Sequence, residues 1–439
     1  MPRTPTRRWS AAWVLAIMCL AGQAAAHAEA NSSRRTQRAA LDSITADDLL
    51  AHAQVLASDA YEGRAAGSRG GRAAASYLAQ QLKRIGVDGG AADGGYYQRI
   101  PGGRRNVLAK LPGADPALAS EWVVLGAHYD HVGYGNRRTS FGPFGYVHNG
   151  ADDNASGVAT VLEIAEAFAD SGARPARSIL IAFWDGEETG MVGSRHWAAN
   201  PTTPLAGVKL AINADMIGRL REGRLQVLGA RTGYGLRRLA SVAVDEGLRL
   251  EFPWPVESSS DHWTFLSRGV PAVMLHTGLH GDYHRPSDDV ERLNIDGLQK
   301  VTRYLLRLTI AAASQPTLPA FRAEGLRETR QTRLVHEQPL GPLPADAPPP
   351  RVGISWRGDH AAPGSVLLTR VAPGSPAARA GLAVHDRVLA IDGQAFTGSD
   401  GFQQHLGARL AERDGPQEVR LLVERGGRTT PRVVRPRQP

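Results

Sequence analysis

The sequence predicts an α/β protein in which a mixed central sheet is flanked by helices, followed by a small β-rich domain. Two observations support this prediction. Apolar runs of strand length alternate with helical patterns between about residues 122 and 308, which is typical of a sheet covered by helices on both faces. After about residue 314 the chain becomes rich in proline, and short strand-like runs follow from residue 352. A chain of 439 residues is long enough for two domains.

The N-terminus is typical of an exported protein. Arg7 and Arg8 precede an apolar segment from about Ala11 to Gly22, and alanines 24–26 provide a small-residue cleavage site. Residues 1–26 are therefore predicted to be a signal peptide, with the mature protein secreted or periplasmic. The arginine pair is compatible with a twin-arginine signal, although the flanking residues fit the general secretory route better. The segment is too short for a transmembrane span, so no stable membrane anchor is expected.

Cysteine content and charge exclude several classes of protein. The single cysteine, Cys19, lies in the signal segment, so the mature chain has no disulfide and no thiolate metal ligand. The net charge of +8 falls to +5 when residues 1–26 and their three arginines are removed. The arginines are dispersed and are not interleaved with aromatic residues. The charge is therefore interpreted as a soluble basic surface and not as a nucleic-acid-binding site.

The first predicted domain spans residues 31–314. A helix is expected from about Thr45 to Ala57, and a second one ends at Gly86. Two later helices have apolar faces at the helical spacing. These faces are formed by Val158, Val161, Leu162, Ala165 and Phe168, and by Leu298, Val301, Leu305 and Leu308.

A pair of adjacent carboxylates is the first indication of chemistry. Glu187 and Glu188 closely follow the apolar run Ile179–Phe183, which reads as a buried strand. Burying two carboxylates at the end of such a strand costs free energy unless a partner such as a metal ion binds them. In a hydrolytic metal site one carboxylate binds the metal and the other handles the proton of the attacking water. The pair therefore predicts one side of such a site.

Three further apolar runs lead to metal-capable side chains at or beyond their ends, which are His128, Asp215 and His284. A separate motif, GADDNASG, brings Asp152 and Asp153. In open α/β sheets the ligand crevice lies outside the carboxyl ends of the strands. These side chains are therefore predicted to share one site.

Histidine and carboxylate ligands without cysteine suit zinc. One catalytic zinc needs three protein ligands and a water. A larger set fits two ions that share a bridging carboxylate and stand ~3.5–4 Å apart. The candidate ligands are His128, Asp215, His284, one acid of the pair Asp152 and Asp153, and one acid of the pair Glu187 and Glu188.

Five motifs in this order carry a family resemblance: HYD, GADDNASG, DGEE, NADM and DYHRPSDD. Together they resemble the co-catalytic zinc aminopeptidases of the bacterial leucyl aminopeptidase and aminopeptidase Y type, over about residues 45–313. The resemblance implies a three-layer zinc-exopeptidase fold. It also implies a cis peptide between Asp153 and Asn154.

The resemblance also implies a role for each residue. His128 and Asp215 would bind one zinc, Glu188 and His284 the other, and Asp153 would bridge the two ions. Among the remaining acids, Glu187 would be the general base, and Asp130 would orient His128.

Other polar residues near the motifs are interpreted as structural. His131 is expected on the substrate side or at the surface and not as a ligand, and Asp152 is expected to form structural hydrogen bonds. Ser260, Asp261 and His262 suggest a catalytic triad. No nucleophile-elbow sequence accompanies them, so Asp261 and His262 are expected to cap the following helix. Ser260 or Asp261 could still support His284.

The C-terminal part closely resembles a PDZ domain. Residues 315–350 are predicted to be an extended, semi-rigid linker that leaves the angle between the domains free, and residues 351–437 form the PDZ unit. Its signature is a short helix closed by Gly381, the hairpin dipeptide Asp392–Gly393 and a helix over about residues 401–412. PDZ domains add an extended chain end as a strand. The PDZ unit is thus expected to recruit a C-terminal peptide without taking part in the chemistry. A chain ending near Ser314 is therefore expected to keep its kcat on small aminoacyl anilides, which are too short to reach the PDZ unit.

These features predict a secreted dizinc aminopeptidase that hydrolyses the N-terminal peptide bond of peptides with a free N-terminus. The acids around the metals would attract the α-ammonium group. One alternative is a glutaminyl cyclase, a single-zinc acyltransferase on the same fold. Another is a PDZ-based binding module with an inactive peptidase body. A carboxypeptidase or amidohydrolase also remains open, because metal ligands do not define which end of a substrate enters.

Overall fold

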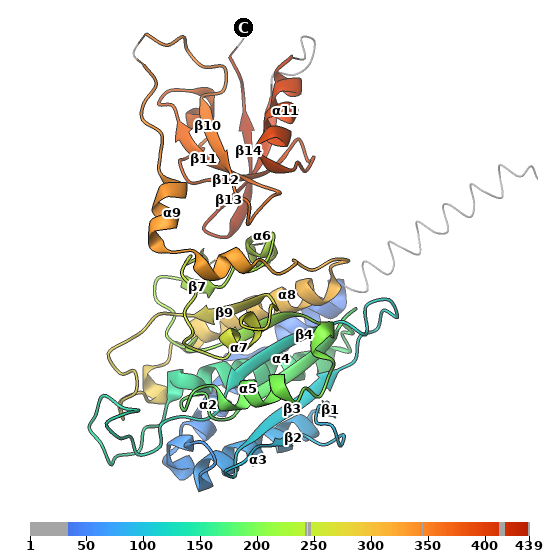
Figure 1. Ribbon diagram of the computed structural model, residues 1–439, viewed down its shortest axis with the longest axis vertical. Helices are drawn as coiled ribbons and strands as arrows, with labels where there is room; N and C mark the ends of the chain where they lie inside the picture. The colour runs from blue at the N-terminus through green and yellow to red at the C-terminus, as the bar shows by residue number, and fades with distance from the viewer. Residues whose placement is uncertain (1–33, 242–243, 245–246, 345, 412–417, 438–439) are drawn as a thin grey trace, which may run out of the picture.

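A computed structural model describes residues 34–241, 244, 247–344, 346–411 and 418–437. The predicted signal peptide lies outside these ranges. A large α/β domain occupies one end of the molecule and a small β domain the other, with helix α9 (Arg330–Glu337) beside their junction (Figure 1). Among the described helices, none combines the length and the apolar character needed to cross a bilayer.

The large domain is built on a nine-stranded mixed sheet, in the order β1-β3-β5-β4-β6-β9-β7-β8, with β2 paired to β3. Strands β4, β5, β6 and β9 run parallel, so their carboxyl ends meet at one edge. The prediction of a mixed sheet is confirmed. The strands are β1 (Asp88–Gly89), β2 (Tyr97–Arg99), β3 (Arg105–Leu111), β4 (Trp122–His128), β5 (Ser178–Trp184), β6 (Val208–Ala214), β7 (Arg224–Leu228), β8 (Arg249–Glu251) and β9 (Ala272–His276).

The central strands are buried on both faces, which divides the core into two layers. In β5, Ile179 and Ile181 pack into the larger apolar cluster, whereas Leu180 and Trp184 pack into the smaller one on the opposite face. This alternation follows from the two-residue period of a strand. It gives the three-layer arrangement that the sequence predicts.

Helices cover both faces of the sheet. Those associated with the larger cluster are α2 (Ala46–Leu56), α3 (Arg69–Arg84), α4 (Gly157–Ser171) and α8 (Ile295–Ser314), with α6 (Leu236–Ser241) against α8. Those associated with the smaller cluster are α5 (Val192–Ala199) and α7 (His262–Leu266). Short helical turns are η1 (Asp59–Arg64), η2 (Ala151–Ser156), η3 (Leu205–Gly207) and η4 (Val290–Arg292).

The small domain is a five-stranded antiparallel sheet with its own apolar core. Trp356 packs edge-on against Phe402, with ring centroids 4.8 Å apart, and so joins β10 to α11. The elements are β10 (Ile354–Gly358), β11 (Val366–Val371), α10 (Pro376–Arg379), β12 (Arg387–Ile391), α11 (Gly398–Ala411), β13 (Val419–Arg425) and β14 (Arg428–Val434).

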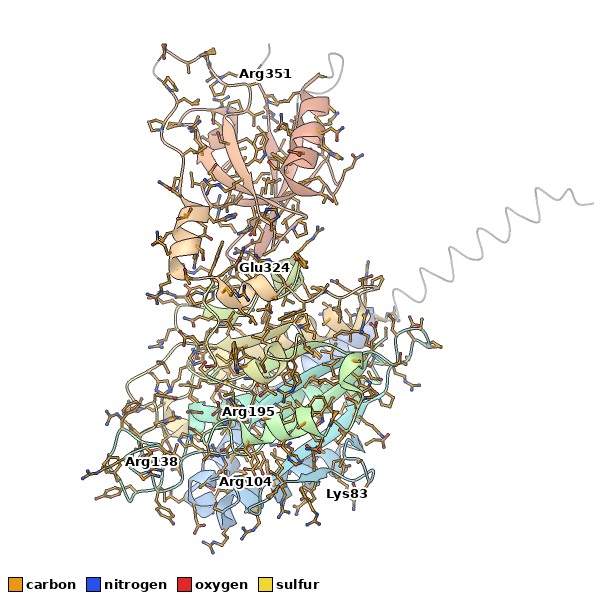
Figure 2. The ribbon with its side chains drawn as sticks, viewed as in Figure 1. Lys83, Arg104, Arg138, Arg195, Glu324 and Arg351 are labelled. Carbon is orange, nitrogen blue, oxygen red and sulfur yellow. The ribbon has the colours of Figure 1, made fainter. Side chains whose placement is uncertain are left out.

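The prediction of an extended linker is wrong for much of residues 315–350. The segment forms the turn η5 (Ala323–Arg327), which carries Glu324 at the junction of the domains (Figure 2), and then helix α9. Thr329 caps α9, because its hydroxyl accepts from the backbone N of Thr332 and its backbone N donates to the Thr332 hydroxyl. Proline is concentrated on either side of this stretch and is absent from residues 320–338, which allows the helix.

The expectation of a free angle between the domains is also wrong in this structure. Arg231 of the large domain donates to Asp359 of the small domain at 2.7 Å and also pairs with Glu328 of the linker. Arg237 on α6 forms a two-pronged pair with Glu424 on β13, at 3.0 and 3.1 Å. Asp359, Glu424 and Arg231 are all buried. Buried charges need partners held in place, so these pairs fix one relative orientation.

Candidate active site

The sheet delivers the predicted site residues to one edge. His128 is the last residue of β4, Asp215 follows β6 directly, and Glu187 and Glu188 follow β5 after two residues. His284 comes from the loop after β9. Because these strands are parallel neighbours, their carboxyl ends place the side chains together. The shared site predicted from the sequence therefore forms.

One half of the site is a group of three side chains. His128 Nε2 lies 3.3 Å from Asp153 Oδ1 and 3.4 Å from Asp215 Oδ1. All three residues are buried. Separations near 3.3 Å are what bond lengths of ~2.0–2.2 Å give between two ligands of one tetrahedral zinc. Three protein ligands would leave a fourth position open.

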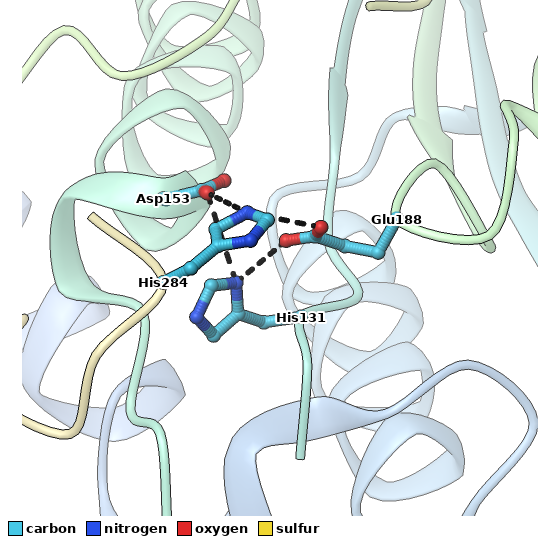
Figure 3. Close-up of side chains that lie close together, drawn as sticks. All are labelled: His131, Asp153, Glu188 and His284. Carbon is cyan, nitrogen blue, oxygen red and sulfur yellow. Dashed lines mark hydrogen bonds and ion pairs between the residues drawn. The ribbon is translucent and has the colours of Figure 1, made fainter. Parts of the chain in front are cut away.

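The other half is a group of four side chains that point toward one another (Figure 3). His284 Nε2 lies 3.1 Å from both Asp153 Oδ2 and Glu188 Oε2. His131 Nδ1 lies 2.8 Å from Glu188 Oε1 and 3.9 Å from Asp153 Oδ2. His131 is only 1% exposed, so its expected surface position is wrong. The backbone places it inside, because its N donates to the Arg64 carbonyl.

Asp153 faces both halves with different oxygens. Oδ1 is directed to His128 and Oδ2 to His284, which is the arrangement of a bridging carboxylate. The Asp288 carboxylate holds the backbone here, because Oδ2 accepts from the backbone N of Asp152 and of Asp153, each at 3.0 Å. The expected cis peptide after Asp153 is present.

The electrostatics of the site fit a cation. Burial lowers the pKa of His284, but Asp153 and Glu188 outweigh burial and raise it to about 10. Burial likewise lowers the pKa of His128, and Asp215 and Glu187 raise it well above its usual range. Protons on both rings thus offset the clustered carboxylates. Metal ions at the same nitrogens would supply this positive charge in their place.

Glu187 lies in the cavity beside the group of three. Its backbone N donates to Asp130 Oδ1 at 3.0 Å. Asp130 Oδ1 also lies 3.7 Å from His128 Nδ1, so Asp130 connects the base candidate to the ligand candidate. Burial raises the pKa of Glu187 well above its usual range, with His128 acting against it. A carboxyl group whose pKa is raised in this way is suited to accept and hold a proton.

Asp152 has the structural role expected for it. Its Oδ1 accepts from the backbone N of Gly218 at 2.6 Å, and its Oδ2 lies 3.1 Å from His280 Nε2. The expected helix-capping role for Asp261 is wrong. Its side chain makes no cap to α7, and Oδ1 accepts from the Ser194 hydroxyl at 2.5 Å.

Arg64 is a buried residue that the sequence analysis missed. Its guanidinium donates to the carbonyls of Leu56, Tyr129, Asn149 and Gly150. It thereby ties the loop after β4 to the segment that precedes Asp153. Burial lowers the pKa of Arg64 to about 10, with Asp153 acting against it. A lone arginine in a polar loop carries no sequence signal for this role.

The site opens into a cavity of about 470 Å³. His128, Asp153, Glu187, Asp215 and His284 line its acidic end. The rest of the wall is formed by Met216, Gln226, Leu228, Pro253, Pro255, Glu257, Ser259, Met274, His276, Gly278, Leu279, Tyr283 and Arg330. The size is typical of a small-molecule site. An acidic end beside an apolar wall can hold an ammonium group next to an apolar side chain.

Comparison with known proteins agrees with this geometry. The sequence model of Peptidase family M28 matches residues 106–309, and that of the PDZ domain matches residues 367–425. Leucine aminopeptidase 1 of Aspergillus clavatus is 27% identical over 272 residues, which are 57% of this chain and 67% of that protein. Leupeptin-inactivating enzyme 1 of Streptomyces exfoliatus is 28% identical over 188 residues, 43% of this chain and 38% of that protein. The chain thus spans between about two fifths and two thirds of these relatives.

Solved structures share the fold of the large domain. The aminopeptidase LapA of Legionella pneumophila superposes with a TM-score of 0.52 and 19% identity, over 64% of this chain and 75% of that one. An aminopeptidase from Aneurinibacillus sp. strain AM-1 superposes with a TM-score of 0.51 and 16% identity, over 65% of this chain and 98% of that one. The expected resemblances of both parts of the sequence are confirmed. The chain is similar to peptidase family M28 over residues 106–309 and to the PDZ domain over residues 367–425.

Proposed function

We propose that the protein is a dizinc aminopeptidase that removes the N-terminal residue of peptides. The observation that carries the proposal is Asp153, whose two carboxylate oxygens face two separate ligand groups. His128 and Asp215 would hold one ion, and Glu188 and His284 the other. His131 completes four potential protein ligands in the second group. The match to Peptidase family M28 supports a peptidase.

In this proposal zinc, when bound, polarises the scissile carbonyl and makes the attacking water more acidic. Glu187 accepts the proton of that water and delivers it to the leaving amine. Asp130 holds the backbone of Glu187 and faces the second nitrogen of His128, which fixes the base relative to the ligands. The acids at this end of the cavity attract the α-ammonium of the substrate.

We further propose that the protein is exported through the signal at residues 1–26. The PDZ domain then binds a C-terminal peptide beside β10, without taking part in the chemistry. Support for this role is the PDZ match and the position of β10 at the edge of its sheet, where a strand can be added.

A substrate panel tests the proposed function. Leucine anilide, N-acetylated leucine anilide and a glutaminyl peptide are each incubated with the full chain, with a chelator, and with chelator followed by zinc. Hydrolysis of the free leucine anilide alone, lost with chelator and restored by zinc, is the expected result. Cyclisation of the glutaminyl peptide without anilide hydrolysis would identify a glutaminyl cyclase. No turnover of any substrate with zinc bound would indicate an inactive binding module.

Metal content provides the second test. Elemental analysis at saturation should approach about two zinc ions per chain. A plateau at one ion, together with an active Asp215→Asn variant, would defeat the dinuclear site.

A further inference from the structure

One residue from outside the large domain lines the active-site cavity. Arg330, the first residue of α9, lines the same cavity as His128 and Glu187. Its side chain is exposed, and it has no hydrogen bond or ion pair within the described residues. An unpaired cation therefore lines a cavity that also carries the carboxylates of Asp153, Glu187 and Asp215.

Helix α9 is held firmly enough to make this position definite. At its C-terminal end, Arg357 of β10 donates to the carbonyl of Val335 at 2.7 Å, and His385 meets the carbonyl of Glu337 at 2.9 Å. Before its N-terminal end, Glu328 pairs with Arg231 and Arg322. The Thr329 cap fixes the first turn. Both ends of α9 are therefore anchored, and Arg330 stays at the wall of the cavity.

The adjoining wall is braced by the same contacts. Pro253 and Pro255 line the cavity, and Trp254 between them lies under the guanidinium of Arg231, 3.5 Å from its ring centroid. Arg231 is in turn paired with Glu328 and Asp359. The linker and the PDZ domain thus hold Arg231, which packs on the wall of the substrate cavity.

The lining of this cavity carries charges of both signs. The metal-ligand end carries Asp153, Glu187 and Asp215, which suit an α-ammonium group. Arg330 supplies a guanidinium, which suits a carboxylate. Glu257 also lines the cavity and is exposed, but no ion pair joins it to Arg330. A short peptide has an ammonium at one end and a carboxylate at the other, which matches this arrangement.

We propose that Arg330 binds the C-terminal carboxylate of short peptide substrates and makes the protein prefer peptides of a few residues with a free C-terminus. This inference rests on the proposed aminopeptidase function and adds the class of substrate. Arg330 is then a specificity residue supplied by the linker. A cavity of about 470 Å³ has room for only a short peptide.

The test compares free acids with amides in a length series. Leu-Gly, Leu-Gly-Gly and Leu-Gly-Gly-Gly are each assayed as the free acid and as the C-terminal amide, with the full wild-type chain and its variants. At one or two of these lengths the wild-type kcat/KM should be roughly five- to tenfold higher for the acid, the range expected for a charge pair in a partly open cleft. Arg330→Ala should bring this ratio close to one, Arg330→Glu should invert it, and Arg330→Lys should retain part of it.

Arg327→Ala is the matched control, because Arg327 is also an exposed linker arginine but does not line the cavity. It should keep the wild-type ratio of acid to amide. An equal ratio in wild type and Arg330→Ala at every length would overturn the inference. So would an acid preference that appears only in longer peptides and survives Arg330→Ala, because that result would assign carboxylate recognition to the PDZ groove. Wild-type activity on leucine anilide reports separately on the proposed function.

Discussion

Removing the imidazole of His131 should weaken the binding of one metal ion and leave the other largely unaffected. The structure supports this through four separations between ligand atoms, which are 2.8, 3.1, 3.1 and 3.9 Å. Ligands of one tetrahedral zinc, at bond lengths of ~2.0–2.2 Å, lie about 3.3 Å apart. Each of these four separations therefore has to change by only about 0.6 Å or less for His131, Asp153, Glu188 and His284 to hold one zinc ion.

The size of the effect follows from how His131 contacts Glu188. As a ligand it supplies one of four bonds, and as a hydrogen-bond donor at 2.8 Å it orients the carboxylate. Loss of a partner that only orients a ligand lowers metal affinity ~10–100-fold, which corresponds to about 1.4–2.7 kcal/mol. His131→Ala should therefore lose at least this much affinity at one site.

The assay is a stepwise metal titration with a competing chelator, followed by cobalt substitution and absorption spectroscopy. His131→Ala should show one weakened binding step and an altered cobalt spectrum, and His131→Gln should recover part of the affinity. His148→Ala is the matched control, because His148 is buried nearby and bonds to Ser140 and Tyr146. Two unchanged binding constants with an unchanged cobalt spectrum would show that His131 neither binds nor orients a ligand.

Three further predictions follow from the site and the domain contacts. Glu187→Gln should keep zinc but lower kcat by at least ~10²-fold, because the general base is lost. Glu188→Gln should instead lose metal, because a ligand is lost. Elemental analysis together with kinetics checks both variants, and the opposite pattern would exchange the two roles. Asp359→Asn should lower the free energy of unfolding by about 3–5 kcal/mol, because buried Arg387 loses its partner and buried Arg231 is left with Glu328; urea unfolding measures the change. The sequence alone predicts that a chain ending at Ser314 keeps its kcat on leucine anilide. The structure instead predicts that it loses most of its kcat, because the wall at Pro253 and Pro255 loses the contacts of Arg231 with Glu328 and Asp359 that brace it. An unchanged kcat would show that this wall needs no brace.

The same aspartate predicts a pH dependence. Burial raises the pKa of Asp359, but Arg387 and Arg231 outweigh burial and hold it well below its usual range. A carboxyl with a lowered pKa stabilises the fold above its unfolded pKa of about 4, and this contribution is lost as the pH falls through the folded value. Wild-type stability should therefore fall below about pH 4. Asp359→Asn should make the free energy of unfolding depend less on pH below about pH 4. An unchanged pH dependence would show that Asp359 does not cause this loss of stability.

Much of the large domain could be predicted because its signals are local. Residues 179–183 and 122–127 are continuous apolar runs, and residues 208–214 are apolar apart from Lys209 and Asn213; each becomes a central parallel strand. A strand buried on both faces has no polar alternation, so its length and composition identify it. Acids and histidines at the ends of these runs then converge because parallel strands share one carboxyl edge. The candidate ligands therefore followed from the motifs alone.

Other residues could not be placed because their partners are distant in sequence. His131 is three residues from His128, but its position depends on a backbone bond to the carbonyl of Arg64. The buried contacts of Arg64 reach residues up to 86 positions away. The helix α9 in the linker could not be predicted because the flanking prolines dominate the composition, whereas the Thr329 cap that starts α9 is a single short signal.

The domain arrangement changes what the PDZ unit can do. Arg357 lies on β10, the strand beside the predicted peptide groove, and its guanidinium holds the C-terminal carbonyls of α9. Arg330 at the other end of α9 lines the active-site cavity. One eight-residue helix therefore links both places where a peptide carboxylate could bind. If a ligand added to β10 displaces Arg357 from these carbonyls, occupancy of the groove should alter carboxylate selectivity in the cavity. Measuring the acid-to-amide ratio of a short substrate in the presence of a saturating C-terminal peptide therefore tests the connection, because an independent groove would leave that ratio unchanged.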